Sequence, residues 1–327
     1  MLGGIRVNFD YLCISCMKDK GNNNICPYCG FDKSAYNLIG SELLPYSILN
    51  SRYLIGKVIG YGIFGITYLA YDINLRIKVA IKEYFPRDFA FRDKDDALVF
   101  CFSPEAKDKY DYGIDEFLQE ARTLARFQEN PCIVSIKDFF RENNSAYYVM
   151  NYVDGITLRD YINQIDDKKI DFTLAYRIMV PVMDALKEIH KLGMLHRDIC
   201  PENIYITRKK QIKLLEFGAA RYMLGDKSRN LSLILRPGYA PEEQYRSKGN
   251  QGPFSDVYSL SAAIYEIITG IKPEEALERM EEDRLIPPSE MNIAIPEKSD
   301  KALMKALSIK GKDRYETIEE FQRELIP

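Results

Sequence analysis

Residues 194–218 read MLHRDICPENIYITRKKQIKLLEFG, and this stretch decides the fold of the chain. Asp198 and Asn203 lie on a loop, because Pro201 prevents the segment between them from forming a helix. A short apolar strand follows, a polar turn reverses the chain, and a second strand brings Glu216 back beside the loop. Two acidic groups and one amide therefore meet at one point. Such a group can hold divalent cations and a nucleophilic hydroxyl at one phosphoryl group.

Residues 196–203, HRDICPEN, resemble the catalytic loop of the protein kinases, in which His-Arg-Asp is followed by four residues and Asn. The chain is similar to the eukaryotic-like serine/threonine protein kinases of bacteria. The resemblance implies that Asp198 accepts the proton of a substrate hydroxyl, and that Asn203 and Glu216 hold magnesium. Glu216 is a departure, because the family has the aspartate of Asp-Phe-Gly at this position.

Three glycines, Gly60, Gly62 and Gly65, have the Gly-x-Gly-x-x-Gly spacing that kinases and dinucleotide-binding folds both use. A dinucleotide fold requires a helix directly after the glycines. Residues 66–71 are instead mostly β-branched, aromatic or apolar, and they predict a strand. A glycine loop between two strands is the kinase arrangement, and its backbone can lie flat over the phosphates of ATP.

Residues 77–82, IKVAIK, predict a strand with one buried face, because Ile, Val and Ile alternate with Lys, Ala and Lys. The resemblance implies that Lys82 contacts the α- and β-phosphates. The helix predicted over EFLQEARTLARF carries Glu120 on its apolar stripe, where a carboxylate requires a cation, and we expect Lys82 to be that cation. Residues 83–112, between strand and helix, form a charged insertion to which the sequence assigns no role.

A further segment supports the resemblance. Residues 147–155, YYVMNYVDG, resemble the hinge between the two kinase lobes. The adenine-binding residues that this resemblance implies are Ala80, Met150, Asn151 and Val153.

The activation segment of a kinase ends in Ala-Pro-Glu, which residues 240–242 match, and the resemblance pairs that glutamate with Arg314. Asp256 begins an apolar helix, where its carboxylate caps free N–H groups, and in the family it also accepts from the catalytic-loop backbone. Ser228 and Ser232 lie in the middle of the segment, either as solvated serines or as phosphorylation sites.

Near the start of the chain, Cys13 and Cys16 form one Cys-x-x-Cys pair, and Cys26 and Cys29 form another. Four thiolates predict a closed, structural zinc site that resembles the small zinc ribbons of many bacterial proteins. The alternative is two disulfides or four free thiols. The other three cysteines are scattered, which favours a reducing compartment, and we expect a cytoplasmic protein.

Composition limits the remaining choices. The 327 residues include 45 Lys+Arg and 48 Asp+Glu, a formal net charge of -3, so the basic stripe of a nucleic-acid-binding protein is missing. Hydrophobic residues make up 46%, enough for a sizeable core. No run approaches the roughly 18 apolar residues of a membrane helix, and we expect no membrane segment. The oligomeric state is not predicted.

The sequence therefore predicts an α+β, bilobal protein-kinase-like fold, with an antiparallel sheet and one helix in the N-lobe and a mainly helical C-lobe. The expected divisions are a zinc ribbon (1–33), a linker (34–50), the N-lobe (51–150), and the hinge with the C-lobe (151–327). Because the linker is long and polar, we expect the ribbon to unfold without affecting the kinase domain. The resemblance implies ATP, with Mg or Mn, and a protein substrate.

The sequence leaves two functions open, an active kinase and a pseudokinase that acts through contacts. Three departures favour the pseudokinase: Glu216, Cys200 in place of the catalytic-loop lysine, and Leu235 in place of the threonine that bonds to that lysine and to the catalytic aspartate. The last two are a matched pair that leaves no orphan charge. Activity is favoured by the retained Lys82, Glu120, Asp198 and Asn203. A zinc-ribbon nucleic-acid binder carrying a kinase-like fold is a third reading, without a basic patch to support it.

Overall fold

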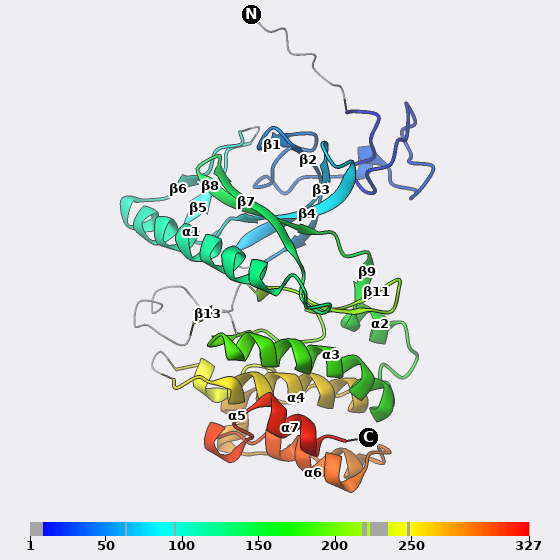
Figure 1. Ribbon diagram of the computed structural model, residues 1–327, viewed down its shortest axis with the longest axis vertical. Coiled ribbons are helices and arrows are strands. Elements are labelled where there is room, and N and C mark those ends of the chain that lie inside the picture. Colours follow the sequence, from blue (N-terminus) through cyan, green and yellow to red (C-terminus); the bar gives the residue numbers. More distant parts are fainter. Residues whose placement is uncertain are drawn as a thin grey trace, which may run out of the picture. The chain divides into compact units, whose positions relative to one another are not determined.

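The computed structural model describes residues 9–62, 64–94, 96–217, 221–222, 235–246 and 249–326. The chain divides into two compact units (Figure 1). The first unit comprises Met1–Arg126 with Ser135–Tyr152, and the second comprises Phe127–Val134 with Val153–Pro327. The segments expected to form the ribbon and the linker both fall within the first unit.

An antiparallel sheet with the strand order β1-β2-β3-β4-β8-β7 forms the centre of the first unit. Its strands are β1 (Ile48–Leu49), β2 (Tyr53–Tyr61), β3 (Gly65–Asp72), β4 (Ile77–Tyr84), β7 (Ile136–Glu142) and β8 (Ser145–Asn151). Every residue of β3 except Tyr71 is buried, so its β-branched and aromatic residues pack on both faces. The sheet confirms the prediction for the N-lobe.

A single long helix, α1 (Pro104–Leu124), packs against β7 and β8. The side chain of Ser103 caps it by accepting from the backbone N–H of Ala106. Phe117 and the other apolar residues of the predicted stripe are buried, which confirms the predicted helix and its apolar face. The helix nevertheless begins well before residue 116, and the end of the 83–112 insertion forms its first turns.

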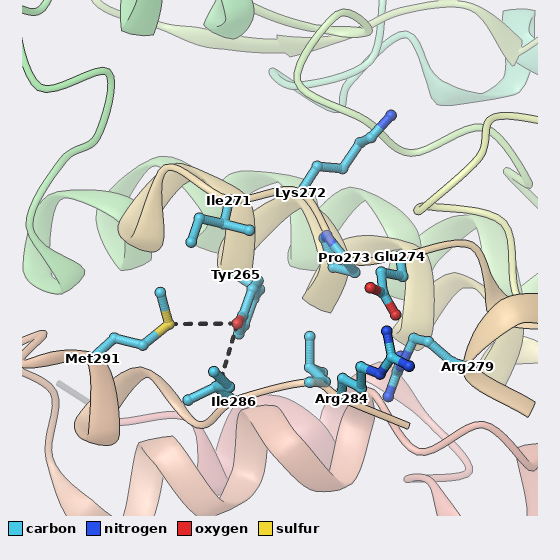
Figure 2. A pocket seen from close by; sticks show the side chains of 10 residues that line it. Tyr265, Ile271, Lys272, Pro273, Glu274, Arg279, Arg284, Ile286 and Met291 are labelled. Atoms are coloured by element: carbon cyan, nitrogen blue, oxygen red, sulfur yellow. Dashed lines mark hydrogen bonds between the residues drawn. The ribbon is translucent and has the colours of Figure 1, made fainter. Parts of the chain in front are cut away.

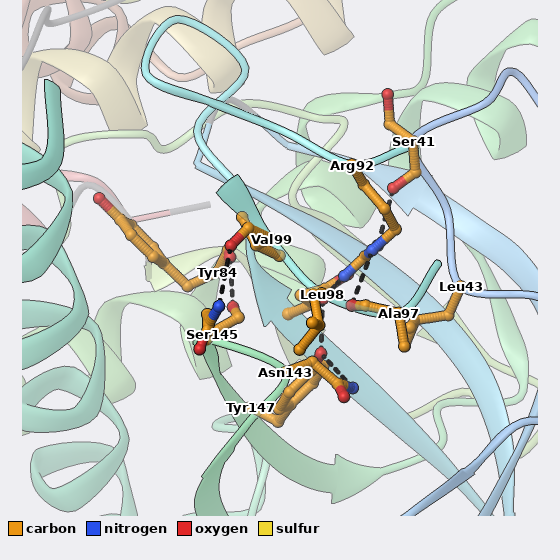
Figure 3. A network of polar contacts seen from close by, with 12 residues as sticks. Ser41, Leu43, Tyr84, Arg92, Ala97, Leu98, Val99, Asn143, Ser145 and Tyr147 are labelled. Carbon is orange, nitrogen blue, oxygen red and sulfur yellow. Dashed lines mark hydrogen bonds and ion pairs between the residues drawn. The ribbon is translucent and has the colours of Figure 1, made fainter. Parts of the chain in front are cut away.

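The rest of the insertion is built around a buried arginine. It contains β5 (Ala90–Phe91) and β6 (Phe100–Cys101), which pair with each other. Arg92, which follows β5, forms an ion pair with Glu83 and donates to the carbonyl oxygens of Ser41 at 2.8 Å and Ala97 at 3.1 Å (Figure 3). A buried charge is tolerated when it is paired and hydrogen-bonded in this way.

Glu83 connects this arginine to the sheet. The carboxylate is fully buried and accepts from the hydroxyls of Tyr68 at 2.8 Å and Tyr147 at 2.6 Å. The hydroxyl of Tyr68 in turn accepts from the backbone N–H of Leu43 at 3.1 Å. The insertion thus fixes residues 41–43 against the sheet, which gives a structural role to a segment that had none from the sequence.

The cysteine-containing segment also packs on the sheet. The backbone N–H of Lys57 in β2 donates to the carbonyl oxygen of Ile14 at 2.9 Å. Val58, next along the strand, donates to the hydroxyl of Tyr36 at 2.9 Å. A Cβ on Gly56 would lie 2.6 Å from the carbonyl oxygen of Ile14, so only glycine permits this approach. These contacts contradict our expectation that the ribbon is independent of the domain that follows, because residues 34–50 are packed against that domain.

The second unit is mainly helical, as predicted. Its helices are α2 (Leu158–Asn163), α3 (Phe172–Lys191), α4 (Pro253–Thr269), α5 (Ala276–Glu281), α6 (Glu297–Ala306) and α7 (Ile318–Glu324). Its strands β9 (Gly155–Thr157), β11 (Ile204–Thr207) and β12 (Ile212–Leu214) form one sheet, and β10 (Met194–Leu195) pairs with β13 (Arg221–Tyr222). Helix α4 is buried from Ser255 to Thr269 and packs against α3, α6 and α7. Within the described residues, none of the helices combines the length and the apolar character needed to cross a bilayer.

Candidate active site

The loop between β10 and β11 holds a carboxylate and an amide in direct contact. The side-chain nitrogen of Asn203 donates to Oδ2 of Asp198 at 2.8 Å and to its carbonyl oxygen at 2.7 Å. Because β12 pairs antiparallel with β11, the N–H of Leu215 donates to the carbonyl oxygen of Asn203 at 2.9 Å. Glu216 follows directly, with φ at 61°, a backbone conformation uncommon for residues other than glycine. The hairpin therefore carries all three predicted groups on adjoining backbone.

A buried aspartate of α4 holds the backbone of this loop. Asp256 accepts from the N–H of His196 through Oδ2 and from the N–H of Arg197 through Oδ1, both at 2.8 Å. The ring nitrogen Nε2 of His190 lies 2.7 Å from Oδ2. The predicted contact of Asp256 with the catalytic loop is thus present. Arg197 has φ at 67°, and these bonds offset the strain of that conformation.

His196 packs beneath the hairpin. Its ring meets that of Phe217 edge-on, with centroids 4.7 Å apart, and Nε2 lies 3.2 Å from the carbonyl oxygen of Leu215. Complete burial lowers the pKa of His196, despite the opposing charges of Asp256 and Asp198. A neutral imidazole in this place supports the loop and carries no charge to it.

An arginine that the sequence analysis missed lies on the carboxylate of Asp198. Nε of Arg236 donates to Oδ1 of Asp198 at 2.7 Å, while the other oxygen accepts from Asn203. Burial raises the pKa of Asp198, and the charges of Arg236 and His196 oppose that rise. Cys200, two positions after Asp198, is fully buried, and burial raises the pKa of its thiol, so it brings no charge.

The glutamate that pairs with Arg314 is Glu243, and our assignment of that role to Glu242 is wrong. Arg314 donates to the two carboxylate oxygens of Glu243 at 2.7 and 3.2 Å, and both residues are buried. Glu242 instead pairs with the exposed Arg246 at 2.6 Å. The end of the activation segment is therefore shifted by one residue. The residue at the position of the family's threonine is therefore Arg236, and our assignment of that position to Leu235 is wrong.

In the first unit, the three glycines occupy the connection between β2 and β3. Gly60 lies near the end of β2, and the N–H of Gly62 donates to the carbonyl oxygen of Gly65 at 2.8 Å. A Cβ on Gly65 would lie 2.2 Å from the carbonyl oxygen of Glu83, so its approach to β4 requires glycine. A glycine loop between two antiparallel strands excludes the dinucleotide-binding arrangement.

Lys82 and Glu120, the predicted ion pair, both reach Tyr148. The lysine is 4% exposed, and its Nζ lies 5.8 Å from the centre of the Tyr148 ring. The hydroxyl of Tyr148 donates to Oε1 of Glu120 at 3.4 Å. Lys82 lies on β4 opposite Tyr148 on β8, so strand register and helix packing together bring a buried cation and a buried carboxylate to one ring.

The predicted adenine-binding residues lie close to this point. Ala80 lies opposite Met150 in the pairing of β4 with β8, and Asn151 lies opposite Val79. Val153 follows the end of β8 and is the residue at which the chain enters the second unit.

The four N-terminal cysteines form a cluster. Their sulfur atoms all lie within 4.8 Å of one another, with Sγ atoms 3.7 Å apart for Cys13 and Cys29 and for Cys16 and Cys26. Zinc–sulfur distances of about 2.3 Å in a tetrahedron imply sulfur separations of about 3.8 Å. The spacing therefore fits a single tetrahedral metal ion, and all seven cysteines are free of disulfides.

A pocket elsewhere in the second unit is lined by none of these predicted site residues. The hydroxyl of Tyr265 donates to the carbonyl oxygen of Ile286 at 2.9 Å and lies 3.6 Å from Sδ of Met291 (Figure 2). The volume of this pocket, about 130 Å³, is far below the 300–1,000 Å³ of typical ligand sites, so a nucleotide does not fit.

Ser228 and Ser232, the candidate phosphorylation sites, lie outside the described residues.

Comparisons with known proteins agree with these observations. A family profile described as "Protein kinase domain" matches residues 53–319. The serine/threonine-protein kinase PknB of Mycobacterium leprae is 33% identical over 291 residues, 85% of this chain and 43% of that protein. PknB of Mycolicibacterium smegmatis is 31% identical over 292 residues, with the same coverage. The chain thus spans less than half the length of these curated relatives.

Two solved structures show the same fold. The chain is similar to the apo form of PpkA-294, with a TM-score of 0.75 and 35% identity, over 88% of this chain and 100% of that one. The kinase domain of Mycobacterium tuberculosis PknI gives a TM-score of 0.63 at 20% identity, over 87% of this chain and 98% of the other. The second likeness concerns the fold alone.

Proposed function

This chain belongs to the protein kinase domain family, and we propose that it transfers the γ-phosphate of ATP to serine or threonine hydroxyls of proteins. The observation that carries the proposal is the contact between Asp198 and Asn203 on the hairpin that also carries Glu216. The names of the curated relatives support the serine/threonine class. The identity of the protein substrate is left open.

In the proposed step, Asp198 accepts the proton of the substrate hydroxyl as its oxygen bonds to the γ-phosphorus. The bond from that phosphorus to the bridging oxygen breaks, and ADP leaves with the electron pair. No other covalent bond changes. The protein contributes position and charge, and Asn203 orients the carboxylate through its amide N–H.

In the first unit, we assign Lys82 to the α- and β-phosphates and Glu120 to holding that lysine. Their burial and shared contact with Tyr148 support this pairing. The phosphate-covering residues are Gly60, Gly62 and Gly65, and the adenine-binding residues are Ala80, Met150, Asn151 and Val153.

Asn203 and Glu216 are the proposed ligands of magnesium or manganese, which neutralises phosphate charge when bound. The amide nitrogen of Asn203 makes both hydrogen bonds to Asp198, so its oxygen is the atom available to a cation. Cys13, Cys16, Cys26 and Cys29 are the proposed zinc ligands. Four thiolates leave no open position, so the role is structural. Such a site requires reduced thiols, and the proposed compartment is the cytoplasm.

The second candidate is a pseudokinase that binds nucleotide and acts as a signalling or scaffolding module. Glu216 favours it, because a side chain longer by one methylene changes the reach of a metal ligand. A single-turnover assay with radiolabelled MgATP and casein separates the two, with Asp198→Asn as the control. Labelled protein that disappears in the control supports the kinase. Nucleotide binding with no transfer at any enzyme concentration would leave the pseudokinase.

A further inference from the structure

The carboxylate proposed as the catalytic base is shared between the catalytic loop and the activation segment. Oδ1 of Asp198 accepts from Arg236 at 2.7 Å and Oδ2 accepts from Asn203 at 2.8 Å. The side chain of Arg236 is 41% exposed and that of Asp198 is 20% exposed. The guanidinium therefore contacts a partly buried carboxylate, while part of the guanidinium itself stays exposed and can bind a ligand.

Arg236 lies at a defined position of the activation segment, and that position indicates what the contact with Asp198 does. Arg314 and Glu243, 71 residues apart, fix the end of the segment, and Arg236 lies seven positions before that glutamate. After the one-residue shift, the family's threonine position is that of Arg236 and not of Leu235, and the resemblance implied a lysine at Cys200. Here the catalytic loop has lost a cation and the activation segment has gained one, so the charge around Asp198 is conserved.

Neighbouring contacts hold the arginine in place. The backbone N–H groups of Tyr239 and Ala240 both donate to the carbonyl oxygen of Arg236 at 3.0 Å. Nη2 of Arg159 donates to the hydroxyl of Tyr239 at 2.7 Å, while its Nε donates to Glu202 of the catalytic loop at 2.8 Å. The turn that begins at Arg236 is thus tied to the loop that carries Asp198.

We propose that Arg236 supplies the cation of phosphoryl transfer that the catalytic loop lacks. Nε holds Asp198, and the remaining N–H groups bind the oxygens of the γ-phosphate. This inference rests on the proposed kinase function. A hydroxyl that donates to Asp198 lies about 2.6–3.2 Å from it, and its oxygen attacks phosphorus from about 3–3.5 Å. A guanidinium bonded to Asp198 is therefore within reach of the phosphoryl oxygens.

Arginine suits this double task. Its planar guanidinium has five N–H donors in a fixed fork that matches phosphate geometry, and one donor is used on Asp198. Its charge persists at all working pH values, and it forms no covalent bond during transfer. In GTPases, an arginine positioned at the transferring phosphoryl group contributes about 10³–10⁵ in rate.

The test is a double-mutant cycle of wild type, Arg236→Thr, Cys200→Lys and Cys200→Lys/Arg236→Thr, with transfer to casein measured in MgATP. We expect Arg236→Thr to lower kcat about 100-fold or more. The lysine should raise activity at least tenfold more in the Arg236→Thr background than in wild type, because only there does it restore a missing charge. Arg246→Thr, which removes an exposed arginine three positions after the segment ends, should leave kcat within twofold.

Three results would overturn the inference. The first is that Arg236→Thr retains activity within threefold of wild type. The second is that it raises activity, which would mean that the ion pair inhibits the enzyme. The third is that Cys200→Lys has equal effects in both backgrounds. A role in folding alone would lower the melting temperature without this coupling.

A binding measurement separates this inference from the proposed function. Titration calorimetry with MgATP and MgADP measures the preference for ATP, which is the Kd for MgADP divided by the Kd for MgATP. We expect this ratio to be at least threefold lower in Arg236→Thr than in wild type. If wild type transfers no phosphate but this preference falls, the kinase function fails and the γ-phosphate contact stands. If the preference is unchanged, the inference fails whatever the transfer assay shows.

Discussion

The residues of the first unit that we propose to bind phosphate and the loop of the second unit that carries Asp198 differ in how closely they follow the kinase pattern. The three glycines, Lys82 and Glu120 all stand at their expected positions. Around Asp198, by contrast, Cys200, Glu216 and Arg236 replace residues that the family pattern has. Under the proposed function, the first group fits a nucleotide whose shape does not change. The second group consists of protein residues facing one another, and such partners can be exchanged together.

The exchange preserves charge while moving it. Glu216 has the charge of the aspartate it replaces. Cys200 replaces the lysine of the family, and Arg236 places a different cation on Asp198. Counted one at a time, these changes resemble the losses of a pseudokinase. Taken with the contact between Arg236 and Asp198, they describe a rearranged site in which each lost group has a substitute.

The largest expected effect is in the first unit. Lys82→Met should lower transfer about 10³-fold while the fold survives, because the buried cation that neutralises phosphate charge is lost. Lys78→Met, an exposed lysine on the same strand, is the matched control and should change the rate less than twofold. The measurement is kcat/KM for ATP together with the melting temperature. Near-normal transfer by Lys82→Met would mean that the phosphate-binding residues are misassigned.

A smaller effect is expected at Glu216. Magnesium requires near-ideal octahedral geometry, and a misplacement of about 1 Å can cost about 100-fold in rate. Glu216→Asp should therefore raise kcat in magnesium by up to about 100-fold and change ATP affinity less. Manganese should partly rescue the wild type. Equal rates for both forms in magnesium would show that the rearranged site is adapted to glutamate, which would sharpen the contrast between the units.

The third effect concerns the stability of the first unit. Cys26→Ser should release the metal and detach the ribbon, because four thiolates must bind together. We expect the melting temperature of the first unit to fall by about 3–6 °C, since contacts worth about 1–2 kcal/mol are lost. Cys101→Ser is the control, because Cys101 lies outside the cluster. Elemental analysis should give one zinc per wild-type chain. An unchanged melting temperature after zinc loss would mean that the ribbon is independent after all.

The smallest effect is at the glycine loop. The hydroxyl of Tyr61, directly before Gly62, donates to Oε1 of Glu42 at 2.5 Å. Because Tyr61 is 46% exposed, the bond is partly screened, and Tyr61→Phe should cost about 0.5–1 kcal/mol in ATP binding. We expect KM for ATP to rise about threefold with kcat unchanged. Tyr71→Phe on the same hairpin is the control. A change in kcat without a change in KM would contradict this role.

The sequence predicted the hairpin that carries Asn203 and Glu216, the N-lobe sheet and the mainly helical second unit, because each depends on patterns within a short stretch. It misplaced the end of the activation segment, since APEE contains two glutamates and only the distant Arg314 distinguishes them. That one-residue error concealed Arg236. The sequence also did not predict that the cysteine segment packs on the sheet. Several of these contacts are made by backbone groups of β2, and backbone contacts do not affect the pattern of side chains.

The contacts along β2 also determine where this chain can be cut. Ile55 donates to the carbonyl oxygen of Ser47 and accepts from Tyr46, and Lys57 donates to Ile14. A fragment that begins at residue 51 would still contain the whole region that the family profile matches, residues 53–319. It would nevertheless expose a row of unpaired backbone groups along an open sheet edge, which is a template for pairing with other chains. A kinase fragment trimmed to the boundaries of its family is therefore expected to aggregate, and one that keeps the cysteine segment to remain dispersed.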